Sequence, residues 1–102
     1  MILSESDLVA AITRDRAAGK RIAFAAMSFD LLKAGDVRLL QAAAAKADRL
    51  VVAVADGGPE RVTAAADRAE IVDSLRGVDY VIVCAADGVD ALAALLMPDV
   101  RA

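Results

Sequence analysis

The chain alternates between short runs that are apolar throughout and longer segments in which apolar residues recur every three or four positions. The apolar runs are Ile22–Met27, Leu50–Ala55 and Tyr80–Cys84. A run without polar alternation is typical of a strand that is buried on both faces, as in a parallel sheet. We therefore predict strands over residues 21–27, 49–55 and 79–84, and residues 99–102 form a candidate fourth strand.

Helical periodicity fills the segments between these runs. Ser4 is the expected N-cap of the first helix, and Gly19 is its expected stop signal. On this helix Leu8 lies on the apolar side, and Asp15 is predicted to face water. The predicted helices cover residues 5–18, 36–47, 59–75 and 89–97.

The order of elements predicts one α/β domain over residues 1–102. Strands separated by helices imply a parallel sheet with right-handed crossovers. In such a sheet, ligands bind at the carboxyl ends of the strands. The candidate ligand loops are therefore residues 28–35, 56–59 and 85–88.

Composition narrows the classes of function. The chain has 102 residues, a net charge of −3 and no histidine. The missing histidine excludes Ser-His-Asp hydrolysis and His-ligated zinc, and the negative charge argues against a nucleic-acid partner. Cys84 is the only cysteine, which fits a reducing cytoplasm. We see no signal peptide and no apolar run of membrane-spanning length, and so expect a cytoplasmic protein without a membrane partner.

Residues 29–40 carry a recognisable sequence, FDLLKAGDVRLL. It resembles the signature of the cytidylyltransferase-like nucleotidyltransferases, in particular the adenylyltransferase domain of ADP-heptose synthases, which reads roughly GxFDxLHxGHxxxL. Residues 18–100 continue the resemblance in the segments GKRI, ADRLVVAV, DRAEIV, GVDYVIV and MPDV. The resemblance implies a three-layer α/β/α Rossmann-like nucleotidyltransferase fold. Its small parallel sheet should have three to four strands in the order 2-1-3-4, with Ile22–Met27 between the second and third.

The chain departs from the family pattern where the chemistry lies. The two histidines of the family's HxGH core, which contact the triphosphate, are replaced by Lys33 and Asp36. The loop after the second strand is reduced to Asp56-Gly57-Gly58-Pro59, and the chain ends before the family's last strand and its late Ser/Thr-rich phosphate motif. These departures predict a domain that keeps the scaffold without the transfer chemistry.

The residues around the first candidate loop each have a structural and a functional interpretation. Lys33 is either a solvated lysine, which we favour, or a cation for phosphate. Asp36 is expected to cap a helix, and its alternative role is as a magnesium ligand. Asp30 is expected to bond backbone N–H groups of the turn. Gly35 is expected to permit a tight turn or a close approach of the backbone.

The remaining candidates lie further along the chain. Arg68 matches a position where family members carry a basic residue near substrate, and we favour a solvated helix arginine here. Asp56 and Gly57 either face the sugar of a nucleotide or form a plain strand-to-helix loop. Cys84 is expected to be a small core residue. If a vestigial nucleotide or phosphate pocket exists, its residues are Ser28, Phe29, Asp30, Lys33, Gly35, Asp36, Asp56, Gly57 and Arg68.

Three functions remain open. The leading hypothesis is a non-catalytic nucleotidyltransferase-like domain, without catalytic or metal-ligating residues, that acts by nucleotide or phosphate binding or by self-association as a homodimer. The alternative is an active adenylyl- or cytidylyltransferase on a sugar phosphate, which would need Mg²⁺ and ATP or CTP. The third is a purely structural assembly domain.

Overall fold

A computed structural model describes residues 1–27, 34–56 and 64–102. Its helices are α1 (Glu5–Ala17), α2 (Ala34–Ala44), α3 (Ala65–Asp73) and α4 (Val89–Leu96). Its strands are β1 (Ile22–Met27), β2 (Arg49–Asp56), β3 (Tyr80–Ala85) and β4 (Val100–Arg101). A single 3-10 turn, η1 (Ala86–Gly88), leads into α4.

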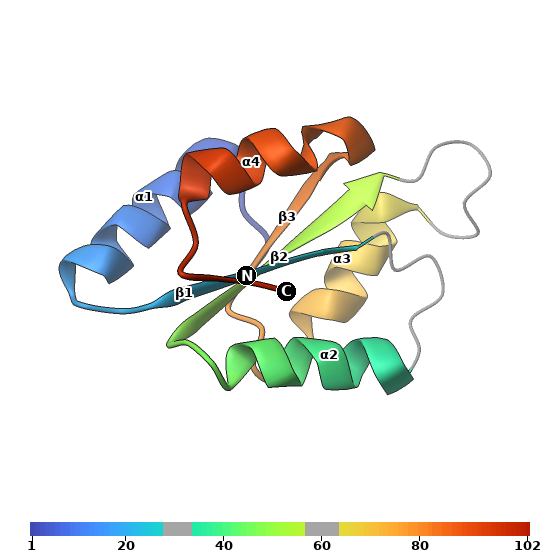
Figure 1. The fold of residues 1–102 in the computed structure, drawn as a ribbon. Coiled ribbons are helices and arrows are strands. Elements are labelled where there is room, and N and C mark those ends of the chain that lie inside the picture. Colours follow the sequence, from blue (N-terminus) through green and yellow to red (C-terminus); the bar gives the residue numbers. More distant parts are fainter. Residues whose placement is uncertain (28–33, 57–63) are drawn as a thin grey trace.

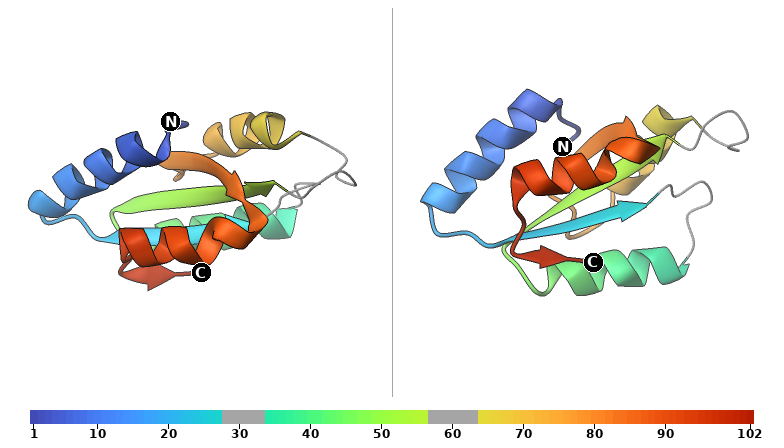
Figure 2. Two further views of the ribbon diagram at one scale, coloured as in Figure 1. Left: turned by 90° about the horizontal axis from the view of Figure 1, so that it is seen from above. Right: turned by 45° about the horizontal axis from the view of Figure 1, so that its top comes forward.

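The four described strands form one parallel sheet between two layers of helices (Figure 1). Helices α1 and α4 bury Leu8, Ile12 and Leu96 against one face of the sheet. Helices α2 and α3 bury Leu40 and Val72 against the other face. Figure 2 shows α1 and α4 on one side of the sheet and α2 on the other. The predicted three-layer α/β/α fold is therefore confirmed.

The strand order is β3-β2-β1-β4, so the predicted order 2-1-3-4 is wrong. Strand β1 does lie inside the sheet, but its neighbours are β2 and β4. Strand β2 takes the place between β1 and β3. The apolar pattern of β1 and β2 shows that both are buried on two faces, and it does not show which of them lies beside β3. The exposed end of β3 marks it as an edge strand.

Several element ends differ from the predicted ones. Ser4 caps α1 as expected, since its Oγ accepts a hydrogen bond from the Asp7 N–H at 3.3 Å. Gly19 follows α1 with a φ of +81° that favours glycine. Helix α2 begins at Ala34 and not at Asp36. The helix predicted over 59–75 is described from Ala65 to Asp73, and its predicted start lies outside the described residues.

Aspartates at the amino edge of the sheet link each strand to its neighbour. Asp48, immediately before β2, accepts the Arg21 N–H at 2.8 Å, and Asp99, before β4, accepts the Ile22 N–H at 2.8 Å. Asp79, before β3, accepts the Leu50 N–H at 2.8 Å. Each carboxylate therefore satisfies a backbone donor at the start of the adjacent strand and fixes the register of the parallel pair.

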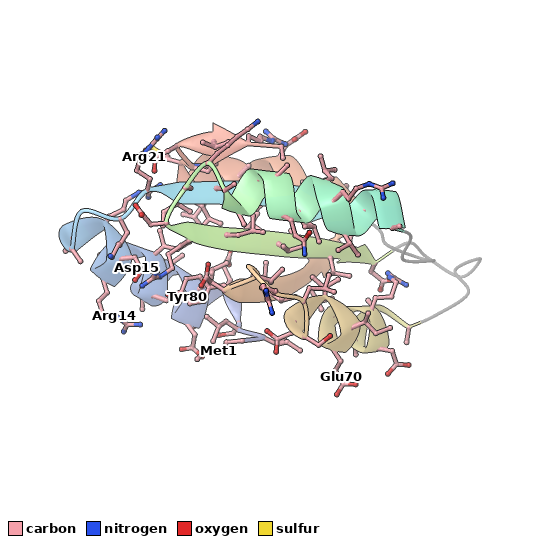
Figure 3. All side chains as sticks on the ribbon, turned by 90° about the horizontal axis from the view of Figure 1, so that it is seen from below. Met1, Arg14, Asp15, Arg21, Glu70 and Tyr80 are labelled. Atoms are coloured by element: carbon pink, nitrogen blue, oxygen red, sulfur yellow. The ribbon has the colours of Figure 1, made fainter. Side chains whose placement is uncertain are left out.

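Asp15 does not face water as predicted. Its carboxylate is buried and accepts a hydrogen bond from the Tyr80 hydroxyl at 2.5 Å. Arg49 Nε lies 3.6 Å from the same carboxylate. Burial, together with the bond to Asp15, raises the pKa of Tyr80. This polar cluster ties α1 to β2 and β3 at the amino edge of the sheet (Figure 3).

The open edge of β3 is partly covered by the N-terminal residues. Val81 donates its N–H to the Met1 carbonyl at 2.8 Å and accepts the Leu3 N–H at 2.8 Å. Within the described parts of the chain, every helix is too short or too polar to cross a membrane.

Candidate functional site

The candidate site lies at the carboxyl edge of the sheet, where β1 ends at Met27, β2 at Asp56 and β3 at Ala85. These ends lie on one side because the strands are parallel. The predicted residues Ser28, Phe29, Asp30, Lys33 and Gly57 lie outside the described residues. Gly35, Asp36, Asp56 and Arg68 are described, and they come from α2, β2 and α3.

Gly35 and Asp36 belong to the first turn of α2. Gly35 is therefore helical, and the predicted tight turn at this position is wrong; a Cβ added there would meet no atom within 4 Å. Asp36 is half-buried and is the acidic residue of the first turn, where its charge interacts favourably with the helix dipole. A phosphate group would bind at this end of the helix for the same reason, so Asp36 opposes it electrostatically.

Asp56 is the last residue of β2, and its side chain is exposed. Its register partner in β3 is Ala85, which precedes η1. The Asp56 carboxylate therefore lies at the carboxyl ends of β2 and β3, where the loops begin. Asp56 is therefore part of β2 and does not belong to the loop that the sequence predicts after this strand.

Arg68 is buried in α3, with only 1% of its surface exposed, so the predicted solvated arginine is wrong. Its Nη2 donates a hydrogen bond to the carbonyl oxygen of Ala55 at 2.8 Å. Because an arginine stays protonated, this places a positive charge under the carboxyl end of β2. The spacing of Arg68 with Ala65, Ala69 and Val72 on the inner face of the helix is the sequence signal that could have identified its burial.

The described residues contain no group of three or more His, Cys, Asp or Glu side chains that could hold a metal ion. Burial raises the pKa of the Cys84 thiol, which favours the protonated form and fits a packing role. Cys84 is half-buried on β3 and not fully buried as expected of a core residue.

A parallel sheet covered by helices on both faces, with charged groups at the carboxyl edge, defines a Rossmann-like α/β domain. The family assignment follows from comparison with known proteins. The chain belongs to the cytidylyltransferase-like family, whose family model matches residues 24–100.

Several curated relatives carry the name bifunctional protein HldE. The protein from Halorhodospira halophila is 40% identical over 96% of this chain and 22% of its own length. The protein from Gluconacetobacter diazotrophicus is 37% identical over 97% of this chain and 22% of its own length. The chain thus spans about a fifth of the length of these relatives.

A solved structure with the same fold is the lipopolysaccharide core biosynthesis protein from Thermoplasma volcanium. It superposes with a TM-score of 0.72 at 24% identity, over 81% of this chain and 73% of that one. At this identity the likeness shows the fold. The resemblance seen in the sequence is therefore confirmed at the level of family and fold.

Proposed function

We propose that this chain is a non-catalytic cytidylyltransferase-like domain that acts by binding a nucleotide or phosphate or by self-association as a homodimer. One observation carries the proposal. The positions of the family's HxGH core read Lys33-Ala34-Gly35-Asp36, and the whole chain contains no histidine. The two imidazole groups that the family aims at the triphosphate therefore have no substitute of the same chemistry.

The position of Asp36 adds support. A carboxylate in the first turn of α2 occupies the favourable end of the helix dipole. Charge that develops on a phosphate during transfer would be repelled there, whereas transfer requires fixed positive groups at that place. The fold is retained, and Asp36 reduces the positive potential at the N-terminal end of α2.

Residual affinity for phosphate has support from two cationic groups. Arg68 holds a buried guanidinium under the end of β2, through its bond to Ala55. Lys33 precedes α2 in the sequence and supplies an ammonium group on a flexible stem. We propose that Lys33 and the backbone of the first turn of α2 line what remains of the pocket, and that Arg68, whose side chain is buried, acts on it only through its positive charge.

The second candidate is an active adenylyl- or cytidylyltransferase that acts on a sugar phosphate. The observation that favours it is the match to the family over residues 24–100, together with the buried cation Arg68. When bound, Mg²⁺ would arrive with ATP or CTP and shield the triphosphate charge. The described residues offer no three-ligand metal group, so no step is assigned to the ion.

Calorimetric titration with Mg-ATP and Mg-CTP tests the binding proposal. We expect weak binding that strengthens in Asp36→Asn, because the substitution removes the like charge and keeps the size of the side chain. Asp7→Asn is the matched control, since Asp7 is also acidic and lies in the first turn of a helix, α1. Equal binding by both variants, or no heat with either nucleotide, would contradict a phosphate site at α2.

Self-association is supported by the width of the sheet and by its exposed apolar residues. A domain of this size buries only part of its apolar surface. Seven large hydrophobic side chains of the described residues are exposed, among them Leu39, Leu95 and Met97. A homodimer is the simplest arrangement that covers such a surface. Light scattering should give twice the chain mass of 10.5 kDa at tens of micromolar.

A further inference from the structure

The order of the strands is that of a dinucleotide-binding sheet. Strand β1 lies between β2 and β4, which gives the order β3-β2-β1-β4. Dinucleotide-binding folds begin with strands in the order 3-2-1-4. In those folds a phosphate group binds at the N-terminus of the helix after the first strand, and an acidic residue at the end of the second strand accepts a hydrogen bond from the ribose. Here the helix after β1 is α2, whose first turn is the phosphate end of the proposed function.

Asp56 occupies the place of that acidic residue. It is the last residue of β2 and follows the first turn of α2 by about twenty positions, as in those folds. It lies two residues beyond Val54, the register partner of Met27 at the end of β1. Because a carboxylate accepts several hydrogen bonds, the exposed Asp56 can accept those of a sugar in addition to the contacts that it already makes.

A hollow lies beside Asp56 at the carboxyl ends of β2 and β3. Its volume of about 390 Å³ is within the roughly 300–1,000 Å³ of small-molecule sites. Among the described residues, Asp56 supplies a carboxylate to its wall, and Val83, Cys84, Ala85 and Ala86 supply a small and largely apolar surface. A hydrogen-bond acceptor beside an apolar surface suits a ligand that joins a sugar to a flat base.

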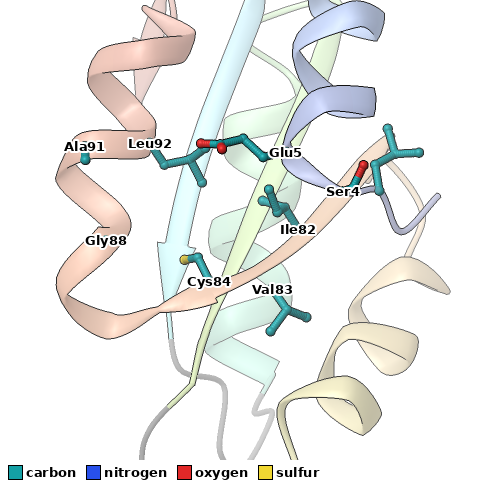
Figure 4. A pocket seen from close by; sticks show the side chains of 9 residues that line it. Ser4, Glu5, Ile82, Val83, Cys84, Gly88, Ala91 and Leu92 are labelled. Atoms are coloured by element: carbon teal, nitrogen blue, oxygen red, sulfur yellow. The ribbon is translucent and has the colours of Figure 1, made fainter.

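The apolar surface continues past this hollow. A groove of about 410 Å³ between the start of α1 and α4 shares Val83 and Cys84 with it. Figure 4 shows the Cys84 side chain directed toward α4 and the Val83 side chain directed away from it. Leu92 and Ile82 extend the apolar wall on the side of α4. A base attached to a sugar at Asp56 can therefore lie against apolar side chains at the end of β3.

We propose that Asp56 makes this chain selective for ribonucleotides, by accepting hydrogen bonds from the 2′- and 3′-hydroxyls of a ribose whose phosphate lies at the first turn of α2. The inference rests on the nucleotide binding in the proposed function and adds the sugar and its position. A 2′-deoxyribose offers the carboxylate one donor fewer, and a 2′-phosphate places a second negative charge beside it. Nucleotides of both kinds should therefore bind more weakly than the matching ribonucleotide.

Calorimetric titration with AMP, 2′-deoxy-AMP and adenosine 2′,5′-bisphosphate tests the inference. The unaltered chain should bind AMP about tenfold more tightly than 2′-deoxy-AMP, because the lost hydrogen bond has a charged acceptor. Asp56→Asn should weaken the binding of AMP and strengthen that of the bisphosphate, since the substitution removes the like charge. Glu70→Gln is the matched control, because Glu70 is an exposed acidic residue of α3 (Figure 3), and it should leave both affinities unchanged. A purely structural role of Asp56 would not change the two affinities in opposite directions.

The outcomes separate this inference from the proposed function. If none of the three nucleotides gives heat, both the proposed nucleotide binding and the role of Asp56 are overturned. If AMP and 2′-deoxy-AMP bind the unaltered chain equally, the role of Asp56 alone is overturned, and nucleotide binding at α2 stands. This comparison of ligands uses the unaltered chain, so it decides the question even if Asp56→Asn fails to fold.

Discussion

The Tyr80 hydroxyl donates a 2.5 Å hydrogen bond to the Asp15 carboxylate, across 65 positions of sequence. Arg49 approaches the same carboxylate from β2, so three elements meet at one buried charge. A buried carboxylate is costly unless it is paired and hydrogen-bonded. The two partners make the burial of Asp15 tolerable and join α1 to the sheet.

Tyr80→Phe should destabilise the chain. The substitution keeps the ring and removes the hydrogen bond to a buried carboxylate, which costs about 1–3 kcal/mol. Urea unfolding monitored by circular dichroism measures this loss in the free energy of unfolding. An unchanged midpoint would show that the Asp15 carboxylate is satisfied without the hydroxyl.

Alkaline pH should weaken the same contact. The folded chain raises the pKa of Tyr80 above that of the unfolded chain, which is about 10. The contribution of this group is therefore fully present below about pH 10 and is lost as the pH rises through the folded pKa. Unfolding curves between pH 8 and pH 11 should show a decline in stability that is smaller in Tyr80→Phe. Parallel declines in the two proteins would contradict this assignment.

Each aspartate that precedes a strand should contribute to the stability of the fold. Asp99→Ala leaves the part-buried Ile22 N–H without its carboxylate acceptor, and we expect a loss of about 1–3 kcal/mol in the free energy of unfolding. Asp87→Ala is the control, since Asp87 is exposed in η1, and it should change the free energy by less than about 0.5 kcal/mol. Equal losses of stability in Asp99→Ala and Asp87→Ala would contradict a role of Asp99 in fixing the strand register.

Arg68 should stabilise the fold in addition to supplying a buried positive charge. Arg68→Met fills similar space but leaves the Ala55 carbonyl without its donor, so we expect a loss of about 1–3 kcal/mol. Arg76→Met on the exposed surface is the control and should stay within about 0.5 kcal/mol. A neutral or stabilising Arg68→Met would indicate that the buried charge is retained for binding and not for folding.

Hydrophobic periodicity predicts the fold class well, because strands buried on both faces, such as β1 and β2, are apolar throughout. It fails on strand order because β1 and β2 have the same apolar pattern. The position of β3 depends on strand pairing that no local pattern encodes. It also fails at Asp15 and Arg68. Their charge predicts that both side chains are exposed to solvent. In the folded chain they are buried, because the tertiary fold brings the hydrogen-bond partners Tyr80 and Ala55 to them.

The candidate site was predictable as a location and not as a set of contacts. The carboxyl edge follows from the parallel order of elements, and the structure places Asp36, Asp56 and Arg68 on the three elements expected to border it. Five of the nine predicted residues lie outside the described residues, so their part in the site stays a prediction.

We propose that this chain does not catalyse nucleotidyl transfer. Each placed donor that stabilises charge in such a transition state is worth about 3–4 kcal/mol, or about a hundred- to a thousandfold in rate. Two are replaced here, by Lys33 and Asp36. Lysine restores a positive charge but not a fixed donor, and aspartate adds a negative charge. Lys33→His with Asp36→His should strengthen triphosphate binding without restoring full turnover.

Pyrophosphate release is the most direct measurement of this claim. The unaltered chain, incubated with Mg-ATP or Mg-CTP and a sugar phosphate, should release pyrophosphate at the background rate of the same mixture without protein. Turnover clearly above that background, abolished by Lys33→Ala, would contradict the proposal and would show that the lysine has taken over the role of the missing histidines.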